Sequence, residues 1–284
     1  MSAILMDGKA LAADIKRTVK EKCLSMETPP ALAVVLVGDN PASAVYVRNK
    51  ERDCAECGIR CIDHRLGEDT TEEQLLSLVA ELNARSDVDG ILVQLPLPPQ
   101  IRERVILEAI DPKKDVDAFH PFNVGRIMQF APQYLPCTPA GIMELLKRYD
   151  IDPAGKNCVV IGRSNIVGKP MALLLLAAGG TVTVCHTRTA DLAAECRRAD
   201  ILVSAAGQVG LVRADMVKPG AVVIDVGVNR VPDATAPRGY RLKGDTDFDA
   251  VSRVASKITP VPGGVGPMTI AMLMNNCVEA GERA

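Results

Sequence analysis

The stretch "GRSNIVGKP" at residues 162–170 lies between the apolar runs Cys158–Ile161 and Met171–Ala178. A loop bounded by glycines between two apolar runs predicts a strand followed directly by a helix. Three known loop motifs almost fit. The dinucleotide fingerprint G-x-G-x-x-G would need glycine at 164 and 167, the phosphate-binding P-loop would need one residue fewer between its glycines, and the nucleophile elbow would need glycine at 166. The loop by itself therefore identifies no ligand.

Strands and helices alternate along most of the chain. Apolar runs predict strands at Ala31–Val37, Cys61–Leu66, Gly90–Gln94, Cys158–Ile161, Thr181–Cys185, Ile201–Ser204 and Ala221–Val226. Apolar residues at helical spacing predict helices at Leu11–Val19, Ala44–Cys57, Gly141–Tyr149, Met171–Ala178, Leu192–Arg198 and Pro267–Ala280, and a further helix that Thr71 opens with an acidic first turn. This alternation is typical of parallel sheets with helices on both faces.

A proline-rich stretch, Asp111–Pro139, interrupts this alternation and shows little helical periodicity. It predicts a functional connection at a domain boundary. We expect an α/β fold with two α/β domains and an interdomain cleft. Residues 1–138 together with 267–284 would form the first domain, and residues 139–266 the second, a Rossmann-like doubly wound parallel sheet.

The composition excludes several classes of partner. The chain has 284 residues and a formal charge of -2, so it offers no broad basic surface to nucleic acid, and its aromatic content of 3% leaves few rings for base stacking. Its longest apolar run is too short to span a membrane, and no signal-peptide core precedes the first charges. We expect a cytoplasmic protein whose nine cysteines are reduced thiols.

Two segments contain possible metal ligands. The C-x-x-C segment at 54–57 is followed by Cys61 and His64, but no second C-x-x-C pair is present, which favours incidental thiols over a zinc site. The D-x-D segment at 115–117 precedes His120 and fits a metal ligand set, a substrate clamp or a charged loop. We expect no metal site.

The residues after the strand Thr181–Cys185 bear on the choice of cofactor. A dinucleotide site that selects NAD usually has an acidic residue about 20 residues beyond its first glycine, where it binds the ribose. This chain instead has Thr187 and Arg188, which suit the 2′-phosphate of NADP through charge-assisted hydrogen bonds, and Arg163 adds a second cation. Asp191 keeps NAD open as an alternative.

Three polar residues in the first half of the chain are expected to lie close together at one edge of the first sheet. Tyr46 and Lys50 are four residues apart and so share one face of the expected helix. Gln94 ends a strand, and open parallel sheets bind ligands at the carboxyl ends of their strands. Each residue taken singly has a simpler explanation: a solvated charge for Lys50, a half-buried core residue for Tyr46 and a strand cap for Gln94.

Six motifs, taken together, resemble those of the methylenetetrahydrofolate dehydrogenase/cyclohydrolase family. In chain order they are "YVRNK" (46–50), "VQLPLP" (93–98), "KDVDAFHP" (114–121), "PCTPAG" (136–141), "GRSNIVGKP" (162–170) and "PVPGGVGPMTIAMLM" (260–274). The resemblance covers nearly the whole chain. It implies an enzyme that oxidises 5,10-methylenetetrahydrofolate with NADP to 5,10-methenyltetrahydrofolate and hydrolyses that product to 10-formyltetrahydrofolate. The family is typically dimeric, so the resemblance also implies a homodimer.

The resemblance implies roles for individual residues. It makes Lys50 the catalytic lysine and Gln94 its hydrogen-bond partner, whereas Tyr46 would stack on the folate and Asp117 would anchor the pterin edge. These four are the catalytic candidates, and with them the substrate-binding candidates are Leu95, Pro262, Gly263 and Gly264. The cofactor-binding candidates are Gly162, Arg163, Ser164, Ile166, Thr187 and Val228. The chain departs from the family at Ala118, where glycine is common.

Two other functions stay open. One is a different two-domain NADP dehydrogenase that acts on a small hydroxy or amino acid, and the other is a folate- or nucleotide-binding regulatory module without catalysis. The folate chemistry fits the residue types, because hydride transfer needs the substrate held against the nicotinamide. Hydrolysis needs a group that moves protons, a role that a lysine takes when its surroundings desolvate it.

Overall fold

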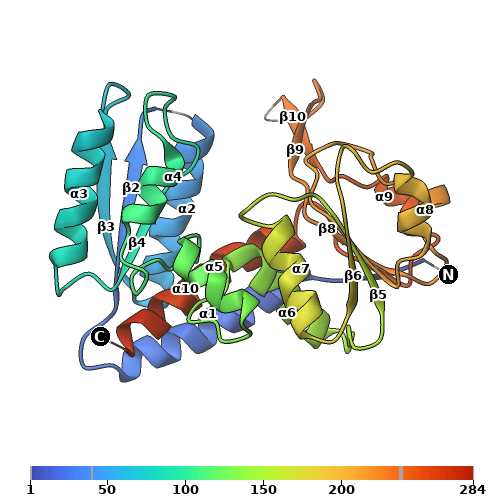
Figure 1. The fold of residues 1–284 in the computed structure, drawn as a ribbon, viewed down its shortest axis with the longest axis horizontal. Coiled ribbons are helices and arrows are strands. Elements are labelled where there is room, and N and C mark those ends of the chain that lie inside the picture. The colour runs from blue at the N-terminus through green and yellow to red at the C-terminus, as the bar shows by residue number, and fades with distance from the viewer. Residues whose placement is uncertain (1, 40, 237–238, 284) are drawn as a thin grey trace. The chain divides into compact units, whose positions relative to one another are not determined.

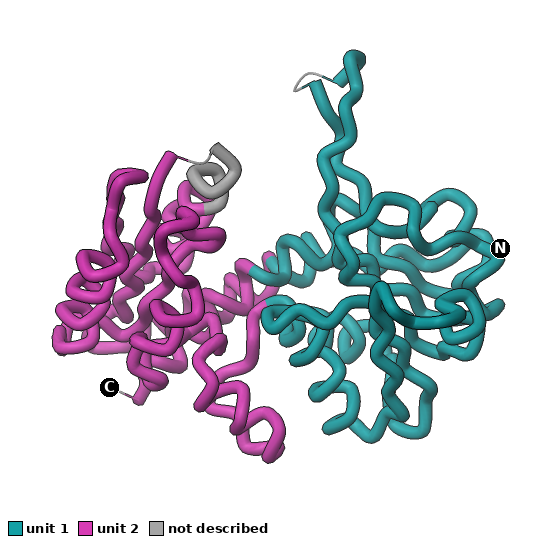
Figure 2. Tube along the Cα trace, turned by 45° about the horizontal axis from the view of Figure 1, so that its top comes forward, with its two compact units in different colours: residues 1–12, 138–269 teal, residues 13–137, 270–284 magenta. Residues whose placement is uncertain are grey.

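The computed structural model describes residues 2–39, 41–236 and 239–283, and it describes the side chains of the helix after residue 40 from Val47 onward. The chain forms two compact units (Figure 2). Unit 1 comprises Met1–Ala12 and Thr138–Thr269, and unit 2 comprises Ala13–Cys137 and Ile270–Ala284.

Unit 2 is built on a three-stranded parallel sheet with the order β3-β2-β4. The strands are β2 (Ala31–Val37), β3 (Arg60–Leu66) and β4 (Gly90–Val93). All seven residues of β2 are buried, as expected for a central strand with both faces covered. Helix α2 (Pro41–Cys57) connects β2 to β3, and α3 (Glu72–Ala84) connects β3 to β4.

The side chains of β2 alternate between two apolar cores. Its even-numbered residues pack against residues of α1 (Gly8–Ser25), α2 and α10 (Val265–Gly281). Its odd-numbered residues pack on the opposite face against residues of α3 and α4 (Glu103–Ala109). The sheet of unit 2 is therefore covered by helices on both faces, and only its edges reach solvent.

Unit 1 is built on a six-stranded parallel sheet with the order β1-β11-β8-β7-β5-β6. The strands are β1 (Ile4–Leu5), β5 (Asn157–Ile161), β6 (Thr181–Cys185), β7 (Ile201–Ser204), β8 (Val222–Asp225) and β11 (Lys257–Ile258). Because β5 lies between β6 and β7, the chain leaves it first to one side and later continues on the other. The carboxyl end of β5 is thus a topological switch point, where open parallel sheets bind ligands.

Helices cover the sheet of unit 1, and one ribbon extends from it. Helix α7 (Gly168–Ala177) packs on β5 and β6. The remaining helices of this unit are α6 (Cys137–Arg148), α8 (Leu192–Arg197), α9 (Phe248–Val251) and the short 3-10 helix η1 (Ala214–Met216). Strands β9 (Asn229–Pro232) and β10 (Tyr240–Lys243) form a separate antiparallel ribbon (Figure 1). Within the described parts of both units, no helix is long and apolar enough to cross a membrane.

The predicted fold class is confirmed, with two α/β units and a parallel Rossmann-like sheet in unit 1. Each of the seven predicted strands is present, with both ends within one residue of the expected position. The helix predicted to open at Thr71 is also present. Thr71 Oγ1 accepts a hydrogen bond from Gln74 N at 3.2 Å and Gln74 Oε1 accepts one from Thr71 N at 2.8 Å, which forms a capping box.

Short elements escaped the prediction. Helix α5 (Pro121–Met128) lies in the stretch that showed little helical periodicity, so this helix was not predicted. Eight residues are too few to show a clear period, and its signals are local: Pro121 at the first turn and His120 as the N-cap. Residues 1–12 were expected in the same domain as residues 13–138, which corresponds to unit 2. They belong instead to unit 1, because β1 pairs with β11.

Candidate functional site

Lys50 and Gln94 meet at the carboxyl edge of the three-stranded sheet. Lys50 shares a face of α2 with the buried residues Val47 and Cys54, so its side chain runs along the covered side of the helix. Gln94 follows the last residue of β4, and its backbone N–H donates to Val35 O at 2.8 Å. Lys50 Nζ donates to Gln94 Oε1 at 3.0 Å. The sheet edge therefore holds a half-buried ammonium group against a neutral amide.

A second hydrogen bond fixes the orientation of the Gln94 amide. Gln94 Nε2 donates to Leu95 O at 2.6 Å, which turns the amide oxygen toward Lys50. The peptide bond between Leu95 and Pro96 is cis. Because an amide carries no net charge, Gln94 orients the Lys50 ammonium without neutralising it.

Asp117 lies close enough to Lys50 for their charges to interact. Burial raises the pKa of the Asp117 carboxyl above its ordinary value, and the positive charge of Lys50 opposes that rise. Cys137 Sγ donates to Asp117 Oδ1 at 3.8 Å. Burial and the Asp117 charge raise the pKa of the Cys137 thiol well above its ordinary value, so the thiol stays protonated. The structure thus brings Lys50, Gln94 and Asp117 together in unit 2.

A second, buried aspartate holds the loop that carries Asp117. Asp115 accepts hydrogen bonds from Phe119 N at 3.2 Å, His120 N at 2.8 Å and Asn123 Nδ2 at 2.8 Å. Burial raises the pKa of the Asp115 carboxyl, and these donors oppose the rise. Asp115 is therefore a structural residue of the D-x-D segment. Among the residues that the structure describes, no three His, Cys, Asp or Glu side chains lie where they could hold a metal ion.

Asn276 of α10 ties the same loop to the C-terminal helix, although no motif marks it. Its side chain is buried, and Asn276 Nδ2 donates to Val116 O at 2.8 Å and to Leu135 O at 3.0 Å. The one available signal was a polar residue inside an apolar helix, because a buried amide needs partners. This residue was not predicted.

Ala118, the departure from the family pattern, is buried and has a left-handed backbone with φ of 58°. Glycine adopts this conformation freely, which gives a physical reason for glycine at this position. The substitution Ala118→Gly would relieve about 1–2 kcal/mol of backbone strain. This gain is offset by the loss of the buried methyl group and by the greater conformational freedom of the unfolded chain.

We expect Ala118→Val to lower the free energy of unfolding by about 3 kcal/mol or more, because a β-branched residue is strained at positive φ and the side chain at this position is buried. Ala118→Gly is the matched control and should stay within about 1 kcal/mol of the parent. Urea unfolding of both variants measures the difference. Equal stability of the two variants would contradict the left-handed conformation.

The remaining substrate candidates are in α2 and in the turn before α10. Tyr46 is in α2, but its side chain lies outside the described residues. Pro262, Gly263 and Gly264 form the turn before α10 and belong to unit 1. Gly263 has φ of 105°, and a Cβ at Gly264 would lie 2.6 Å from Pro260 O, so both positions require glycine.

On the cofactor side, two glycines let the loop after β5 fold back on itself. Gly162 has φ of 119°, and a Cβ there would lie 2.3 Å from Ala205 O. A Cβ at Gly168 would lie 2.2 Å from Gly162 O. Because α7 begins at Gly168, the loop is one residue longer than G-x-G-x-x-G, yet its last glycine still packs the helix against the strand. The loop is therefore a lengthened dinucleotide-type turn.

Ser164 lies in the loop before α7 and accepts hydrogen bonds from backbone N–H groups at the start of that helix. Ser164 Oγ accepts hydrogen bonds from Val167 N and Gly168 N, both at 3.2 Å, and Ser164 O accepts one from Lys169 N at 3.1 Å. These helix N–H groups are engaged within the protein. Arg163, Ser164 and Ile166 are exposed, so the loop at 163–166 presents both polar and apolar side chains at this edge.

The loop after β6 is the neighbour of the loop after β5. Ile161 and Cys185 are paired at the ends of the two strands, and Gly162 N donates to Cys185 O at 2.9 Å. Thr187 and Arg188 follow directly and are exposed. The sheet thus brings the predicted hydroxyl and guanidinium groups to the edge that carries the loop at 163–166.

Asp191, the acidic residue that left NAD as an alternative cofactor, is hydrogen-bonded within the protein. Asp191 is the N-cap of α8, and its Oδ1 accepts a hydrogen bond from Ala194 N at 2.9 Å. Its charge also stabilises the helix N-terminus. Arg163 and Arg188 remain exposed at this edge, so the local charge favours a phosphate over a free ribose hydroxyl.

Val228 lies at the same edge, in the turn after β8, where it is 48% exposed. Beneath this turn are two buried carboxylates, Asp225 and Asp245. Neither was predicted. The available signals were an aspartate that ends an apolar strand and glycines at 227 and 244.

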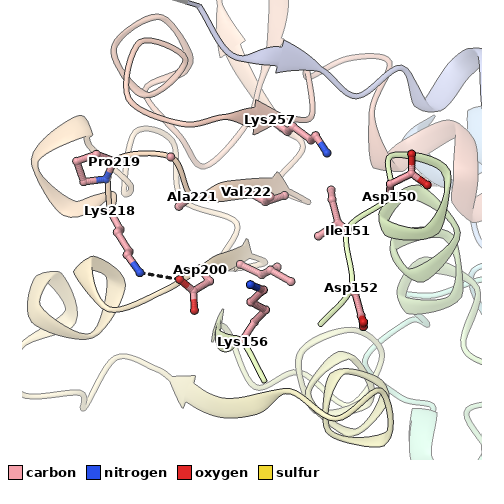
Figure 3. Close-up of a pocket in the computed structure, with 12 residues that line it drawn as sticks. Asp150, Ile151, Asp152, Lys156, Asp200, Lys218, Pro219, Ala221, Val222 and Lys257 are labelled. Carbon is pink, nitrogen blue, oxygen red and sulfur yellow. Dashed lines mark hydrogen bonds and ion pairs between the residues drawn. The ribbon is translucent and has the colours of Figure 1, made fainter. Parts of the chain in front are cut away.

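The cavity in Figure 3 lies at the opposite edge of this sheet. It has a volume of ≈ 390 Å³ and is lined by residues at the amino ends of β5, β7, β8 and β11. Lys218 Nζ lies 2.6 Å from Asp200 Oδ1, and Lys257 Nζ donates to Tyr149 O at 2.5 Å. The cofactor candidates follow the carboxyl ends of the strands instead, so this cavity is separate from them.

Two family models match this chain. The catalytic domain of tetrahydrofolate dehydrogenase/cyclohydrolase matches residues 6–117, and the NAD(P)-binding domain of the same family matches residues 136–284. The chain belongs to this family. The bifunctional protein FolD of Salinibacter ruber is 58% identical over 283 residues, which cover 98% of this chain and 95% of that protein. The resemblance predicted from the six motifs is confirmed.

Solved structures of tetrahydrofolate dehydrogenase/cyclohydrolase proteins agree with this assignment. The crystal structure of FolD from Campylobacter jejuni has a TM-score of 0.95 and 52% identity, and the match covers 100% of both chains. The enzyme of Trypanosoma brucei, complexed with NADP cofactor and inhibitor, has a TM-score of 0.95 and 41% identity, with 100% of this chain and 98% of that chain covered. In this chain, the catalytic-domain match contains Lys50, Gln94 and Asp117, and the NAD(P)-binding match contains all six cofactor candidates.

Proposed function

We propose that this chain is an NADP-dependent 5,10-methylenetetrahydrofolate dehydrogenase and a 5,10-methenyltetrahydrofolate cyclohydrolase. It oxidises the methylene compound to the methenyl cation and hydrolyses the cation to 10-formyltetrahydrofolate. The observation that carries the proposal is the Lys50–Gln94 hydrogen bond of 3.0 Å at a sheet edge, in a chain that matches both domains of the family.

In the oxidation, the protein binds and orients the folate. NADP, when bound, accepts the hydride from the one-carbon group. We assign to Asp117 the binding of the N–H groups on the pterin edge, because its carboxylate accepts hydrogen bonds and sits close to Lys50. The resemblance assigns stacking on the folate to Tyr46, which with Leu95 and the turn 262–264 completes the proposed substrate-binding set. Positioning of this kind supplies much of the acceleration in hydride transfer.

In the hydrolysis, Lys50 manages the protons. Water attacks the methenyl carbon, a C–O bond forms, one C–N bond breaks, and the departing nitrogen keeps its electron pair and receives a proton. The net reaction of cation and water releases one proton. Lys50 is the ionisable group held beside Gln94, so we assign it the transfer of protons between the attacking water, the departing nitrogen and solvent.

We assign the choice of NADP over NAD to Arg163 and Arg188, which are exposed at the carboxyl edge of the six-stranded sheet. We expect Arg163→Ala to raise the Kd for NADP about 10- to 100-fold, because a charge-assisted hydrogen bond to the 2′-phosphate is lost, and to change the Kd for NAD much less. Arg213→Ala removes an exposed arginine that pairs with Asp215 and serves as the control. Equal changes for the two cofactors, measured by calorimetric titration, would contradict the assignment.

A substrate panel tests the function directly. With NADP present, we expect NADPH to form with 5,10-methylenetetrahydrofolate and not with small hydroxy or amino acids. Turnover of a hydroxy or amino acid would instead identify a different two-domain dehydrogenase. Binding of folate and NADP without any turnover would identify a regulatory module. One absorbance measurement and one binding measurement together distinguish these three outcomes.

We further propose that the protein acts as a homodimer in the cytoplasm. All nine cysteines are free thiols in the structure, which suits a reducing compartment. Light scattering on the purified protein should give twice the chain mass of 30.3 kDa. A particle with the mass of one chain would contradict the homodimer.

A further inference from the structure

Two buried aspartates lie under the carboxyl edge of the six-stranded sheet. Asp225 ends β8 and is 1% exposed, and Asp245 follows β10 and is 0% exposed. Buried carboxylates persist when donors surround them. Both residues belong to unit 1, which carries the proposed cofactor site.

Asp245 accepts five hydrogen bonds from two segments. Asp245 Oδ2 accepts from Ser204 Oγ at 3.1 Å, Ala206 N at 2.8 Å and Gly207 N at 3.2 Å. Asp245 Oδ1 accepts from Gln208 N at 2.9 Å and Asn229 Nδ2 at 3.2 Å. Three consecutive backbone N–H groups therefore converge on one carboxylate, which fixes the conformation of the turn after β7.

Asp225 fixes the turn after β8 and is bonded to Asp245 itself. Its oxygens accept hydrogen bonds from Gly227 N at 3.1 Å, Asp245 N at 2.9 Å, Thr246 N at 2.9 Å and Thr246 Oγ1 at 2.7 Å. Burial raises the pKa of the Asp225 carboxyl, the charge of Asp245 adds to the rise, and these donors oppose it. The two carboxylates form one cluster.

Two glycines leave this cluster no room to move. A Cβ at Gly227 would lie 2.0 Å from Asp245 Oδ1, and a Cβ at Gly244 would lie 2.0 Å from Asp225 Oδ2. Each aspartate thus fills the space that a side chain would take on the segment of the other. The turns after β7 and β8 are held in one arrangement.

These turns border the proposed cofactor loop. Ala205 N donates to Ile161 O at 2.8 Å, and a Cβ at Gly162 would lie 2.3 Å from Ala205 O. The exposed side chains of the two turns include Val209 at 44% and Val228 at 48%. The turns therefore stand at the carboxyl edge beside the lengthened dinucleotide-type loop, where a bound dinucleotide would contact them.

We propose that Asp245 is a positioning residue for the cofactor, acting through the turns after β7 and β8 without touching the cofactor itself. The proposal rests on the proposed NADP-dependent function. It predicts that cofactor affinity depends on the acceptor capacity of a side chain buried beneath the site.

Asp245→Asn preserves the size of the side chain and replaces one acceptor oxygen by an NH₂ group that faces donors. We expect the Kd for NADP, measured by calorimetric titration, to rise about 10- to 100-fold, which is what the loss of one or two hydrogen bonds to a charged group produces. The cyclohydrolase rate should stay within about twofold of the parent, because hydrolysis does not use the cofactor.

The matched control is Asp200→Asn at the opposite edge of the same sheet. Asp200 accepts a backbone hydrogen bond from Asn157 N at 2.9 Å and pairs with Lys218 at 2.6 Å, so its loss tests general destabilisation. We expect its melting temperature to fall while its Kd for NADP stays within about twofold of the parent. A merely structural role of Asp245 would give the two variants the same NADP affinity.

An Asp245→Asn protein that binds NADP within about twofold of the parent overturns the proposal. If this variant does not fold, Asn229→Ala decides the question, because it removes one donor to Asp245 and leaves four. A rise of about three- to tenfold in Kd supports the proposal, and an unchanged Kd overturns it. A parent protein that binds NADP but does not turn over folate would refute the proposed function, while the comparison of variants would still decide the role of Asp245.

Discussion

Lys50→Met is expected to lower the cyclohydrolase rate by about 10²- to 10⁴-fold, the usual contribution of a general acid–base group. Methionine keeps an apolar stem of similar length, but it removes the ammonium that donates to Gln94 Oε1 at 3.0 Å. It also removes the positive charge that opposes the raised pKa of Asp117. The proton-transfer step loses its ionisable group, and the neighbouring carboxyl is protonated more readily.

The dehydrogenase rate of Lys50→Met should fall less, because the hydride goes to the nicotinamide and not to a protein group. Lys113→Met is the matched control, since Lys113 is an exposed lysine of the same unit outside the proposed site. We expect both of its rates to remain within about twofold of the parent. Hydrolysis of methenyltetrahydrofolate by Lys50→Met at the parent rate would remove Lys50 from the mechanism.

Gly168→Ala is expected to lower the free energy of unfolding by about 3 kcal/mol or more and to raise the Kd for NADP by more than about 100-fold. A Cβ at Gly168 would lie 2.2 Å from Gly162 O and 2.6 Å from Gly162 C, which are backbone atoms that cannot rotate away. Either α7 separates from β5 or the loop between them changes shape. Both outcomes displace the exposed residues at 163–166.

The control for this change is Gly125→Ala in α5. A Cβ at Gly125 meets nothing within 4 Å, so alanine should stabilise the helix by about 0.5–1 kcal/mol. Urea unfolding and calorimetric titration with NADP measure the two effects. A Gly168→Ala protein with parental stability and affinity would show that the helix does not need close contact with the strand end.

Much of the fold could be predicted because its central strands are short apolar runs. Every residue of β2 is buried between two helical layers, so no polar residue interrupts its pattern. Elements without such runs were missed. Helix α5 has only eight residues, too few to show a clear period. Strands β1 and β11 have two residues each and form by pairing with strands that are distant in the sequence.

The site could be predicted where polar residues lie at or near the carboxyl ends of predicted strands. Lys50 and Gln94 were expected to converge at one sheet edge, and their side chains are hydrogen-bonded. The supporting groups were not predictable, because their partners are remote in the sequence. Asn276 donates a hydrogen bond to Val116, which is 160 residues earlier in the chain. Asp245 accepts hydrogen bonds from Ser204 and Ala206, which are about forty residues earlier. Such contacts appear only when the sheets are assembled.

The motifs identified the family, and the structure explained why the loop at 162–170 departs from G-x-G-x-x-G: Gly168 begins the helix and contacts the strand end one residue later than the pattern requires. The structure also shows the carboxylate of Asp191 engaged as a helix cap. This supports the arginine-based choice of NADP.

We expect this one chain to catalyse both reactions in sequence. The most direct measurement follows NADPH and 10-formyltetrahydrofolate together after NADP and 5,10-methylenetetrahydrofolate are mixed with the protein. We expect both products to form in amounts that converge, because each hydride transferred yields one methenyl cation for hydrolysis. If NADPH forms but hydrolysis is no faster than in a protein-free mixture, or if no NADPH forms, the chain does not catalyse both reactions.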